Sequence, residues 1–429
     1  MQTIASKTDN NRTILESNNM KATHIAATTL QGRRVAQLRA PSVVHNLRCP
    51  MARALLSLAL LAGTASARTW QTVDDFQYTA GQTAVNCGLT VAPSGVVFGC
   101  GFAADGINAE HGLVMASADG GNTWSPPLDD FYAPGWATRD DGGIVADSAG
   151  NLYVAGRFYS SGPFYRFVRR STDGGATWST VDTVRISGFY ASPLAAGGIT
   201  TDATGNVYIT EPILGTWTVR KGIGGTNFST VDTFQPSGSQ AQTVFAHPTA
   251  GVFAVGSGTV VNKNSSSQAW VLRRSLDGGA TWATVDAYQA SGGYAAEAFG
   301  IGADAQGNIY VVGRAAVPNK RSSIMHWQIR QSANGGSSWS TVDDYVLSTS
   351  NNQVATGFAA DSQGNLYATG YSNPVSGTGG PTWIVRESLG GTGAWTTVDA
   401  LPGLAHAIAA DSLGNVFVGG QNPWLVRKN

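Results

Sequence analysis

From residue 68 to the C-terminus, short hydrophobic runs alternate with turn signals rich in Gly, Asn and Asp. One stretch shows the rhythm clearly, with strand-like runs at Phe299 to Ala303, Ile309 to Gly313, Ile324 to Ser332 and Ser338 to Val342. Runs of this length, rich in β-branched and aromatic residues and bounded by turn residues, predict short strands joined by tight turns. The pattern therefore predicts an all-β protein.

The pattern also repeats, and its most regular part is Trp-x-Thr-Val-Asp. Five copies begin at Trp70, Trp178, Trp282, Trp339 and Trp395, and two looser copies run from Trp124 to Asp129 and from Phe228 to Asp232. Successive copies lie 54, 54, 50, 54, 57 and 56 residues apart. Four strand-like runs in each such period are typical of one propeller blade, so we expect a seven-bladed β-propeller with four-stranded antiparallel blades.

A second motif, Asp-x-x-Gly-Asn, lies between the first and second run of each unit. Clear copies begin at Asp147, Asp202, Asp304, Asp361 and Asp411, and two degenerate copies lie around Pro93-Ser94-Gly95 and His247 to Gly251. Gly and Asn tolerate a positive φ, so this motif predicts a tight turn between the first and second strands.

A third motif, Ser-x-Asp-x-Gly-x-Thr-Trp, precedes the fourth run. Full copies span Ser117 to Trp124, Ser171 to Trp178 and Ser275 to Trp282. The motif resembles the Asp-box, or BNR, repeat of sialidase-like propellers, and the resemblance covers essentially residues 68–429. We expect Asp119, Asp173, Asp277 and Asn334 to be structural, with side chains that hydrogen-bond turn amides, and the motif's Trp to pack between blades.

The two ends of the repeat region complement each other. The last unit stops after Trp424 to Arg427, before any fourth strand, whereas Arg68 to Asp74 reads as a fourth strand without its first three. We expect the N-terminal strand to complete the last blade, which would leave no free sheet edge at the seam.

The chain preceding the repeats contains a candidate export signal. Residues 51–67 have a basic start, a short apolar run and an Ala-x-Ala site, which is the layout of a signal peptide. A signal peptide belongs at the start of a protein, so we expect residues 1–50 to be a disordered, non-native upstream extension. The alternative is a genuine leader before an anchor. The prediction implies cleavage after Ala67 and a secreted protein, extracellular or periplasmic.

The charge of residues 68–429 narrows the possible partners. Residues 1–67 hold eight Lys/Arg and two Asp/Glu, which leaves 19 basic and 25 acidic residues and a net charge of −6. An acidic surface argues against nucleic acid as a partner. Nothing in the sequence resembles an apolar transmembrane helix of about 20 residues. We expect a monomer without a membrane span.

Two cysteines, Cys87 and Cys100, remain after the predicted cleavage. Aligning the repeats places them at the positions of Phe299 and Val312, opposite each other on one hairpin. In an oxidising compartment such a pair predicts a disulfide. A zinc site would need four ligands, so we expect neither a metal nor a cofactor.

An arginine recurs near the end of the third run of six units, and the Asp of Thr-Val-Asp recurs in all seven. The arginines are Arg169, Arg220, Arg273, Arg330, Arg386 and Arg427. Because both residues follow the repeat, we interpret them as structural rather than as a substrate-binding cluster. His111, His247, His326 and His406 are expected at unrelated positions, which argues against a metal or Ser-His-Asp site.

Function is expected in the non-repeating loops on the face opposite the two turns. The candidate residues there are Trp136, Arg139, Asp140, Asp141, Arg157, Tyr159, Arg185, Tyr190, Glu211, Tyr294, Glu297 and Arg314. In a non-enzymatic binding protein, the aromatic rings Trp136, Tyr159, Tyr190 and Tyr294 would stack on a glycan or anchor an extracellular protein partner. The alternative is that these rings only pack loops against one another.

The resemblance also implies an enzymatic alternative, a sialidase-like exo-glycoside hydrolase. Arg139, Arg157, Arg185 and Arg314 would form its arginine cluster and Asp140 or Asp141 its acid; Tyr190 or Tyr294 would be the nucleophile, beside Glu211 or Glu297. However, the Arg-Ile-Pro motif of sialidases is absent, since Arg185-Ile186 is followed by Ser187. Long insertions between blades are also missing. We therefore expect a binding protein and assign no catalytic residue.

Overall fold

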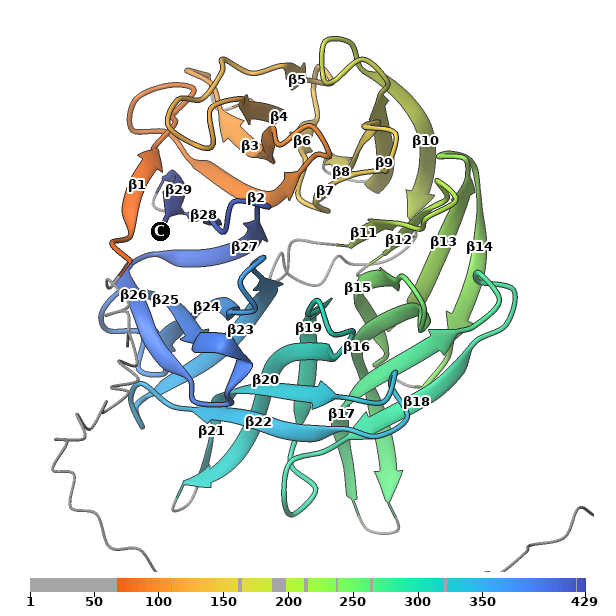
Figure 1. Cartoon of the computed structure of the whole chain (residues 1–429), viewed down its shortest axis with the longest axis vertical. Helices are drawn as coiled ribbons and strands as arrows, with labels where there is room; N and C mark the ends of the chain where they lie inside the picture. Colours follow the sequence, from red (N-terminus) through yellow and green to blue (C-terminus); the bar gives the residue numbers. More distant parts are fainter. Residues whose placement is uncertain are drawn as a thin grey trace, which may run out of the picture. The chain divides into compact units, whose positions relative to one another are not determined.

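The structure is a computed structural model that describes residues 68–429 apart from 108, 161–163, 187–197, 212–214, 237, 263–264, 320–321 and 422. The predicted upstream extension and signal peptide lie outside the described residues. Seven antiparallel sheets surround a common axis (Figure 1). The predicted seven-bladed, all-β propeller is confirmed. None of the helices in the described part of the chain is long and apolar enough to cross a membrane.

The first four blades follow one another along the chain. Blade 1 consists of β2 (Ala84–Val91), β3 (Val97–Ala104), β4 (Glu110–Ser117) and β5 (Asp129–Phe131). Blade 2 consists of β6 (Ala137–Arg139), β7 (Ile144–Ala146), β8 (Leu152–Tyr159), β9 (Phe164–Ser171) and β10 (Ser179–Ile186). Blade 3 consists of β11 (Ile199–Thr201), β12 (Val207–Thr210), β13 (Trp217–Ile223) and β14 (Thr226–Phe234). Blade 4 consists of β15 (Gln240–His247), β16 (Gly251–Asn262), β17 (Ser265–Ser275) and β18 (Ala283–Tyr288).

The last three blades complete the ring. Blade 5 consists of β19 (Ala296–Ala303), β20 (Ile309–Asn319), β21 (Ser322–Ser332) and β22 (Ser340–Tyr345). Blade 6 consists of β23 (Asn351–Ala360), β24 (Leu366–Pro374), β25 (Thr382–Ser388), the 3-10 helix η1 (Leu389–Gly391) and β26 (Thr396–Pro402). Blade 7 consists of β27 (Leu404–Ala410), β28 (Val416–Gln421), β29 (Trp424–Lys428) and β1 (Gln71–Asp74).

The N-terminal strand closes the ring, as predicted. In blade 7, β1 pairs with β29 in antiparallel register, with Gln71 opposite Lys428 and Thr72 opposite Arg427. The Arg427 guanidinium donates to Thr72 Oγ1 at 3.1 Å and to the carbonyl of Trp70 at 3.0 Å. The seam is therefore held by side chains as well as by the strand ladder.

The first strand of each blade lies nearest the axis, and these strands contact one another around it (Figure 1). In five blades this strand contains a β-bulge, at Cys87, Gln242, Phe299, Thr356 and His406. In blade 2 the strand is instead broken into β6 and β7, with Asp140 and Asp141 between them. Bulges re-aim side chains near the rims of closed sheets, so this position can present a different side chain in each blade.

The bulge also overturns the predicted disulfide. Asn86 pairs with Gly101 and Gly88 pairs with Cys100, so Cys87 occupies the bulge and is not opposite Cys100. Both cysteines are buried free thiols. The prediction was wrong because it counted residues across a regular hairpin, and the extra residue in the bulge shifts one cysteine out of register.

The recurring arginine and aspartate pair with each other between neighbouring blades. The six pairs are Arg169–Asp129, Arg220–Asp182, Arg273–Asp232, Arg330–Asp286, Arg386–Asp343 and Arg427–Asp399. Most have the two-pronged geometry of strong arginine–carboxylate contacts, as in Arg273, whose Nε and Nη2 lie 2.7 and 2.8 Å from the Asp232 oxygens. At the seventh junction Met115 occupies the arginine position, and burial raises the pKa of Asp74 to about 7.

A layer of tryptophans packs the blades together on the side away from the named turns. Trp217, Trp270, Trp327, Trp383 and Trp424 are fully buried on the third strands. Each of the last four lies against a glycine of the next blade; a Cβ on Gly313, for example, would lie 2.8 Å from Trp270. The Asp-box tryptophans, by contrast, are only partly buried and pack against the edges of the hydrophobic clusters between the blades.

Candidate functional site

The two repeated turns share one face of the propeller, the turn face, and the remaining connections form the loop face. On the turn face, Asp119 Oδ1 accepts from the Thr123 amide at 2.9 Å and Oδ2 accepts from Thr123 Oγ1 at 2.7 Å. The backbone hydrogen bond and the hydroxyl of Thr123 lower the pKa of Asp119 to about 2. Asp173 and Asp277 make the same contacts, and the Asn334 Oδ1 accepts from the Ser338 amide at 2.9 Å. These side chains organise turns and point to no ligand.

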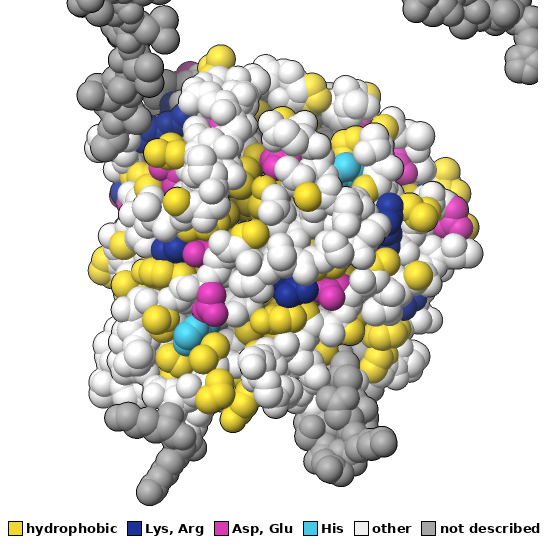
Figure 2. Space-filling model, turned by 60° about the horizontal axis from the view of Figure 1, so that its bottom comes forward, with side chains coloured by type: hydrophobic (Ala, Val, Ile, Leu, Met, Phe, Trp, Pro, Cys, Tyr) yellow, Lys and Arg dark blue, Asp and Glu magenta, His cyan; other side chains and the backbone are white. Residues whose placement is uncertain are grey.

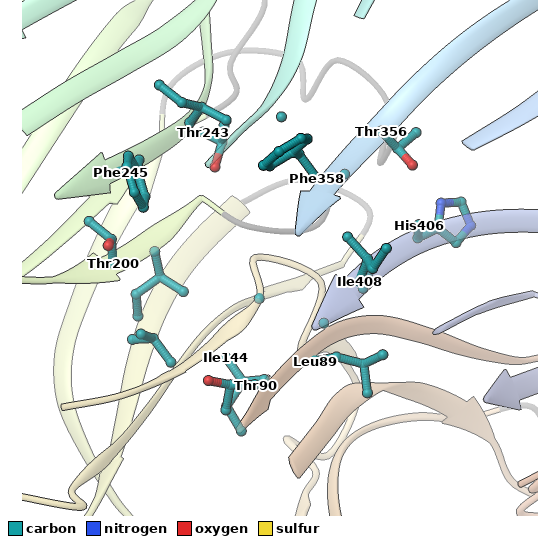
Figure 3. A pocket seen from close by; sticks show the side chains of 18 of the residues that line it. Leu89, Thr90, Ile144, Thr200, Thr243, Phe245, Thr356, Phe358, His406 and Ile408 are labelled. Carbon is teal, nitrogen blue, oxygen red and sulfur yellow. The ribbon is translucent and has the colours of Figure 1, made fainter. Parts of the chain in front are cut away.

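A channel of about 230 Å³ runs along the axis between the first strands. Figure 3 shows side chains of several blades around it, among them Thr90, Thr200, Phe358 and His406. Glycines bring the strands close together here, since a Cβ on Gly88 would lie 2.9 Å from the Cα of Gly143. The channel is narrow and lined mainly by hydroxyl and aliphatic groups.

A larger cavity of about 390 Å³ lies on the loop face and meets the channel at His406. We call it the loop-face cavity. Four blades supply its lining, which consists of Thr83, Val85, Cys87, Phe102, Glu110, Arg139, Tyr371, Leu404, His406 and Gln421. These residues are far apart in sequence and meet only because blades 1, 2, 6 and 7 converge around the axis.

One wall of the loop-face cavity carries a paired charge. Arg139 Nε donates to Glu110 Oε2 at 2.5 Å, and the guanidinium lies 4.1 Å from the centre of the Phe102 ring. The Tyr159 hydroxyl donates to the same Glu110 oxygen at 3.3 Å. Arginine, glutamate and two rings thus form one compact group whose net charge is zero.

The opposite wall presents neutral polar groups. Burial raises the pKa of Tyr371 to about 12 and lowers that of His406 to about 4, so both side chains are uncharged near neutral pH. Among the described residues, His406 Nδ1 has no hydrogen-bond partner. The cavity therefore holds a neutral imidazole and a phenol that can hydrogen-bond an incoming group.

The structure brings together only some of the predicted site residues. Arg139 lines the loop-face cavity. Tyr159 and Arg157 lie beside Arg139, and the Arg157 guanidinium is 5.4 Å from the centre of the Tyr159 ring. Arg314 and Glu297 form an ion pair of 2.8 Å on blade 5, and both act electrostatically on Tyr371.

The other predicted residues lie elsewhere. Trp136 packs edge-to-face on Phe158 and Tyr165, as in the loop-packing alternative. Arg185 is exposed on β10, the outer strand of blade 2, and Tyr294 is 39% exposed in the connection between β18 and β19. Tyr190 lies outside the described residues, so its predicted role has no structural test.

Asp140 and Asp141 belong to a buried polar layer. Where five blades have the buried tryptophan, blade 1 has Gly112 and blade 2 has Arg166. The Asp140 carboxylate fills the space left at Gly112, and burial raises its pKa well above the usual range. Asp141 lies 2.7 Å from Arg157 and 3.6 Å from Arg166. Glu211, also buried, faces Arg220 at 3.8 Å.

Sequence reasoning missed most of the loop-face cavity, although the repeat contains a signal for it. The positions are counted from the first residue of the Asp-x-x-Gly-Asn turn. The residue type five positions before it and the residue type ten positions after it differ from blade to blade, whereas the neighbouring positions repeat. The first gives the bulge residues, including Cys87 and His406; the second gives Phe102, Arg157, Ser257, Arg314, Tyr371 and Gln421. The fold gives these positions the same place in every blade. A residue type that changes there from blade to blade would therefore have indicated these side chains as candidates.

The expectation that the four histidines occupy unrelated positions is wrong for two of them. His111 and His326 both lie six residues before the last Ser of their third strand. Each binds an equivalent aspartate through Nδ1, Asp130 at 2.6 Å and Asp344 at 2.7 Å. Groups of His, Cys, Asp and Glu that could hold a metal are not found among the described residues.

The visible surface in Figure 2 is mostly uncharged. Charged side chains are scattered over it, and several blue groups lie directly beside magenta ones. This agrees with the low charged fraction of the sequence, 13%. On this side the surface consists mostly of uncharged side chains, backbone and hydrophobic groups.

The fold is a β-propeller, and solved structures with a similar fold include a glycoside hydrolase, a polysaccharide lyase and a protein of unknown function. Neither a family model nor a curated protein sequence matches the chain.

Three solved structures illustrate this similarity. One is an α-L-arabinanase from Penicillium chrysogenum complexed with arabinobiose, with 13% identity, 84% of this chain and 98% of that chain covered, and a TM-score of 0.50. A protein of unknown function from Dyadobacter fermentans has 12% identity, the same two coverages and a TM-score of 0.44. A PL25 ulvan lyase has 10% identity, coverages of 81% and 94%, and a TM-score of 0.42. At these identities the likeness concerns the fold alone.

Proposed function

We propose that this protein is a secreted, non-enzymatic β-propeller that binds a glycan in the loop-face cavity. The observation that carries the proposal is the chemistry of its lining, where the Arg139–Glu110 pair and the neutral Tyr371, His406 and Gln421 stand beside aromatic rings. Sugars offer hydroxyl groups to such polar side chains and C–H faces to rings. The volume of about 390 Å³ falls in the usual range for small-ligand sites.

The shape of the site favours a glycan over a folded protein partner. A stable protein interface covers about 800 Å² on each partner and is centred on a few buried anchor residues. The polar groups here converge instead in a concave pocket beside the channel. A monomeric protein exported through the signal at residues 51–67 is consistent with binding a glycan outside the cytoplasm.

The Asp-box repeats support distant membership of the sialidase-like superfamily, but the charges argue against sialidase chemistry. Arg139, Arg157 and Arg314 each already face a carboxylate, Glu110, Asp141 and Glu297 respectively. A substrate carboxylate would have to displace those partners, at the cost of leaving a carboxylate unpaired.

A glycoside hydrolase also needs a carboxyl group whose raised pKa makes it a proton donor. Burial raises the pKa of Asp140 and of Glu211, and neither residue lines the loop-face cavity. The carboxylate that does line it, Glu110, accepts hydrogen bonds from Arg139 and Tyr159. These features support binding over turnover.

The test is binding to a panel of immobilised glycans, followed by calorimetric titration of the best binder. We expect Glu110→Gln to weaken binding at least about tenfold, a loss of about 1.4 kcal/mol, because Arg139 loses its partner. Asp344→Asn is the matched control, since it removes a carboxylate from the His326 pair outside the cavity. Equal affinity of both variants and the wild type would overturn the assignment of the site, and release of a sugar product would establish the enzymatic alternative.

A further inference from the structure

A second cavity, of about 460 Å³, adjoins the loop-face cavity. Its lining consists of Gly81, Gln82, Thr83, Ala84, Gly380, Pro381, Pro402, Gly403, Leu404, Gln421 and Pro423. Thr83, Leu404 and Gln421 line both cavities, so the two lie side by side. We call the combined space the seam groove, because it crosses blade 7, where the two ends of the chain meet.

The two parts of the seam groove differ in chemistry. The inner part contains the Arg139–Glu110 pair, whereas the residues that line the outer part carry no charged side chain. Its walls come from four chain connections, represented by Gln82, Gly380, Gly403 and Pro423. Glycine and proline give these walls little side-chain bulk, so the backbone and the side chains of Gln82, Thr83 and Gln421 supply their polarity.

We infer that the seam groove binds a chain of several uncharged sugar units, one at the Arg139–Glu110 pair and the following units between the outer loops. This inference rests on the proposed function and adds the size and charge of the ligand. A uronic acid or sulfated unit in the outer part would lose hydration without meeting a counter-charge there, whereas hydroxyl groups can bond backbone and Gln421.

The position of Gln421 supports a ligand longer than one unit. This side chain lies at the junction of the two parts, opposite Trp424 at the end of β28, and a fully buried Trp424 fixes that end of the strand. A ligand bound only at the inner pair would leave the outer part filled with water. An oligosaccharide that fills both parts loses its overall translational freedom only once, whereas separate sugar units would each lose it. The affinity should therefore rise with the length of the oligosaccharide.

The experiment is a calorimetric titration of the whole protein with neutral oligosaccharides of one to six units from the cello-, xylo-, manno- and arabino- series. In the series that binds, we expect at least about a tenfold gain in affinity from two to four units and no further gain beyond the length of the groove. Oligogalacturonides of the same lengths serve as the charged series and are expected to bind more weakly.

The matched variants are Gly380→Trp and Gly106→Trp. Neither glycine has a positive φ; a Cβ on Gly380 would meet open space, and one on Gly106 only Thr79 Oγ1 at 3.9 Å. Both are exposed, but only Gly380 lines the groove. We expect Gly380→Trp to reduce the affinity for four units to that for two and to leave two units unaffected, and Gly106→Trp to change neither.

The possible outcomes separate the two proposals. If the protein binds two and four units equally well and Gly380→Trp does not change the affinity, the inference about the seam groove is overturned. Glycan binding in the loop-face cavity would still stand. Equal or tighter binding of oligogalacturonides overturns the uncharged ligand. If the protein binds none of these saccharides but binds a proline-rich peptide, both the proposed function and this inference are overturned.

Discussion

At the scale of single residues, the most distinctive chemistry of this molecule lies where a residue departs from the repeat. Six blade junctions have a buried arginine–aspartate pair, and the seventh has Met115 at the arginine position and Asp74 at the aspartate position. The fold keeps Asp74 where an arginine would neutralise it. The consequence is a carboxyl group that titrates near neutral pH at the seam of the ring.

Asp74 should therefore make stability depend on pH. Burial raises its pKa to about 7 in the native state, against about 3.9 in the unfolded chain. The native state then binds more protons between about pH 4 and pH 7, so this group's contribution to stability falls as the pH rises through that window. We expect Asp74→Asn to remove this fall, and Met115→Arg to remove it as well, because an arginine partner would keep Asp74 ionised throughout that window.

The measurement is the free energy of unfolding in urea at pH 5 and pH 8 for the wild type and both variants. Asp75→Asn is the comparison variant, because the charge of the exposed Asp75 adds to the effect of burial on the pKa of Asp74, so its removal should reduce the fall in stability only in part. The account of the seventh junction fails if Asp74→Asn and the wild type show the same change in stability between the two pH values.

His406 should behave in the opposite way. Burial lowers its pKa to about 4, against about 6.5 when unfolded, so the native state binds fewer protons between those values. Its contribution to stability is therefore lost as the pH falls from about 6.5 towards 4. In an NMR titration we expect the His406 ring signals to stay unchanged down to about pH 5. A midpoint near 6.5 would show that the ring is solvated, and would remove the neutral imidazole from the cavity.

At the scale of elements, one turn uses an imidazole as the hydrogen-bond acceptor where the regular turn uses a carboxylate. In blade 4 the turn Asp is replaced by His247, whose Nδ1 accepts from the amides of Ala250 at 2.9 Å and Thr249 at 3.2 Å. In the regular turn, Asp304 Oδ1 accepts from the amides of Gln306 and Asn308. The sequence predicted a degenerate turn here, but the imidazole still accepts from two turn amides, those two and three residues further along the chain, whereas the aspartate accepts from those two and four residues further along.

This substitution gives a test of the turn. We expect His247→Ala to lower the free energy of unfolding by about 1–3 kcal/mol, because it leaves two turn amides without an acceptor. His247→Asp should retain most of the wild-type stability, because a carboxylate can accept from the same amides. Urea denaturation of both variants is the measurement, and an Ala variant as stable as the wild type would show that these hydrogen bonds contribute nothing.

The hairpin of β2 and β3 shows the limit of repeat alignment at this scale. The strands and the turn between them follow from the pattern of hydrophobic and turn residues, and both are found. The bulge at Cys87 does not follow from that pattern, because one extra residue leaves the hydrophobic run unbroken. The disulfide prediction failed for this reason.

The state of the cysteines can be measured directly. We expect Cys87 and Cys100 to react fully with an alkylating reagent after denaturation without reductant, which gives two adducts in the mass spectrum of the processed chain. The melting temperature should be the same with and without a reducing agent. A mass without adducts, together with a lower melting temperature after reduction, would restore the disulfide.

At the scale of the whole molecule, the repeat predicts the number of blades and the closure of the ring but not the site. The period and the complementary ends are properties of the chain as written, so they can be counted. The loop-face cavity depends on Arg139, Tyr371 and His406, which come from blades 2, 6 and 7 and are close only after the ring has closed. Spacing along the chain does not encode that proximity.

The structure distributes the predicted site residues over several parts of the molecule. Arg139 was identified because it interrupts the repeat among aromatic residues, and it does line the cavity. Asp140 and Arg157 interrupt the repeat too, but they belong to the buried layer that replaces a tryptophan. Polar residues in non-repeating loops can therefore serve either a ligand or a substituted core, and only the packing distinguishes the two.

The central claim is that the loop-face cavity binds a glycan, and the position of a bound saccharide tests it most directly. The measurement is a crystal structure of the protein soaked with the tightest-binding oligosaccharide. We expect density for a sugar ring between Tyr371 and the Arg139–Glu110 pair. Density only on the turn face, for instance in the cavity of about 500 Å³ beside His247 and Leu276, would contradict it.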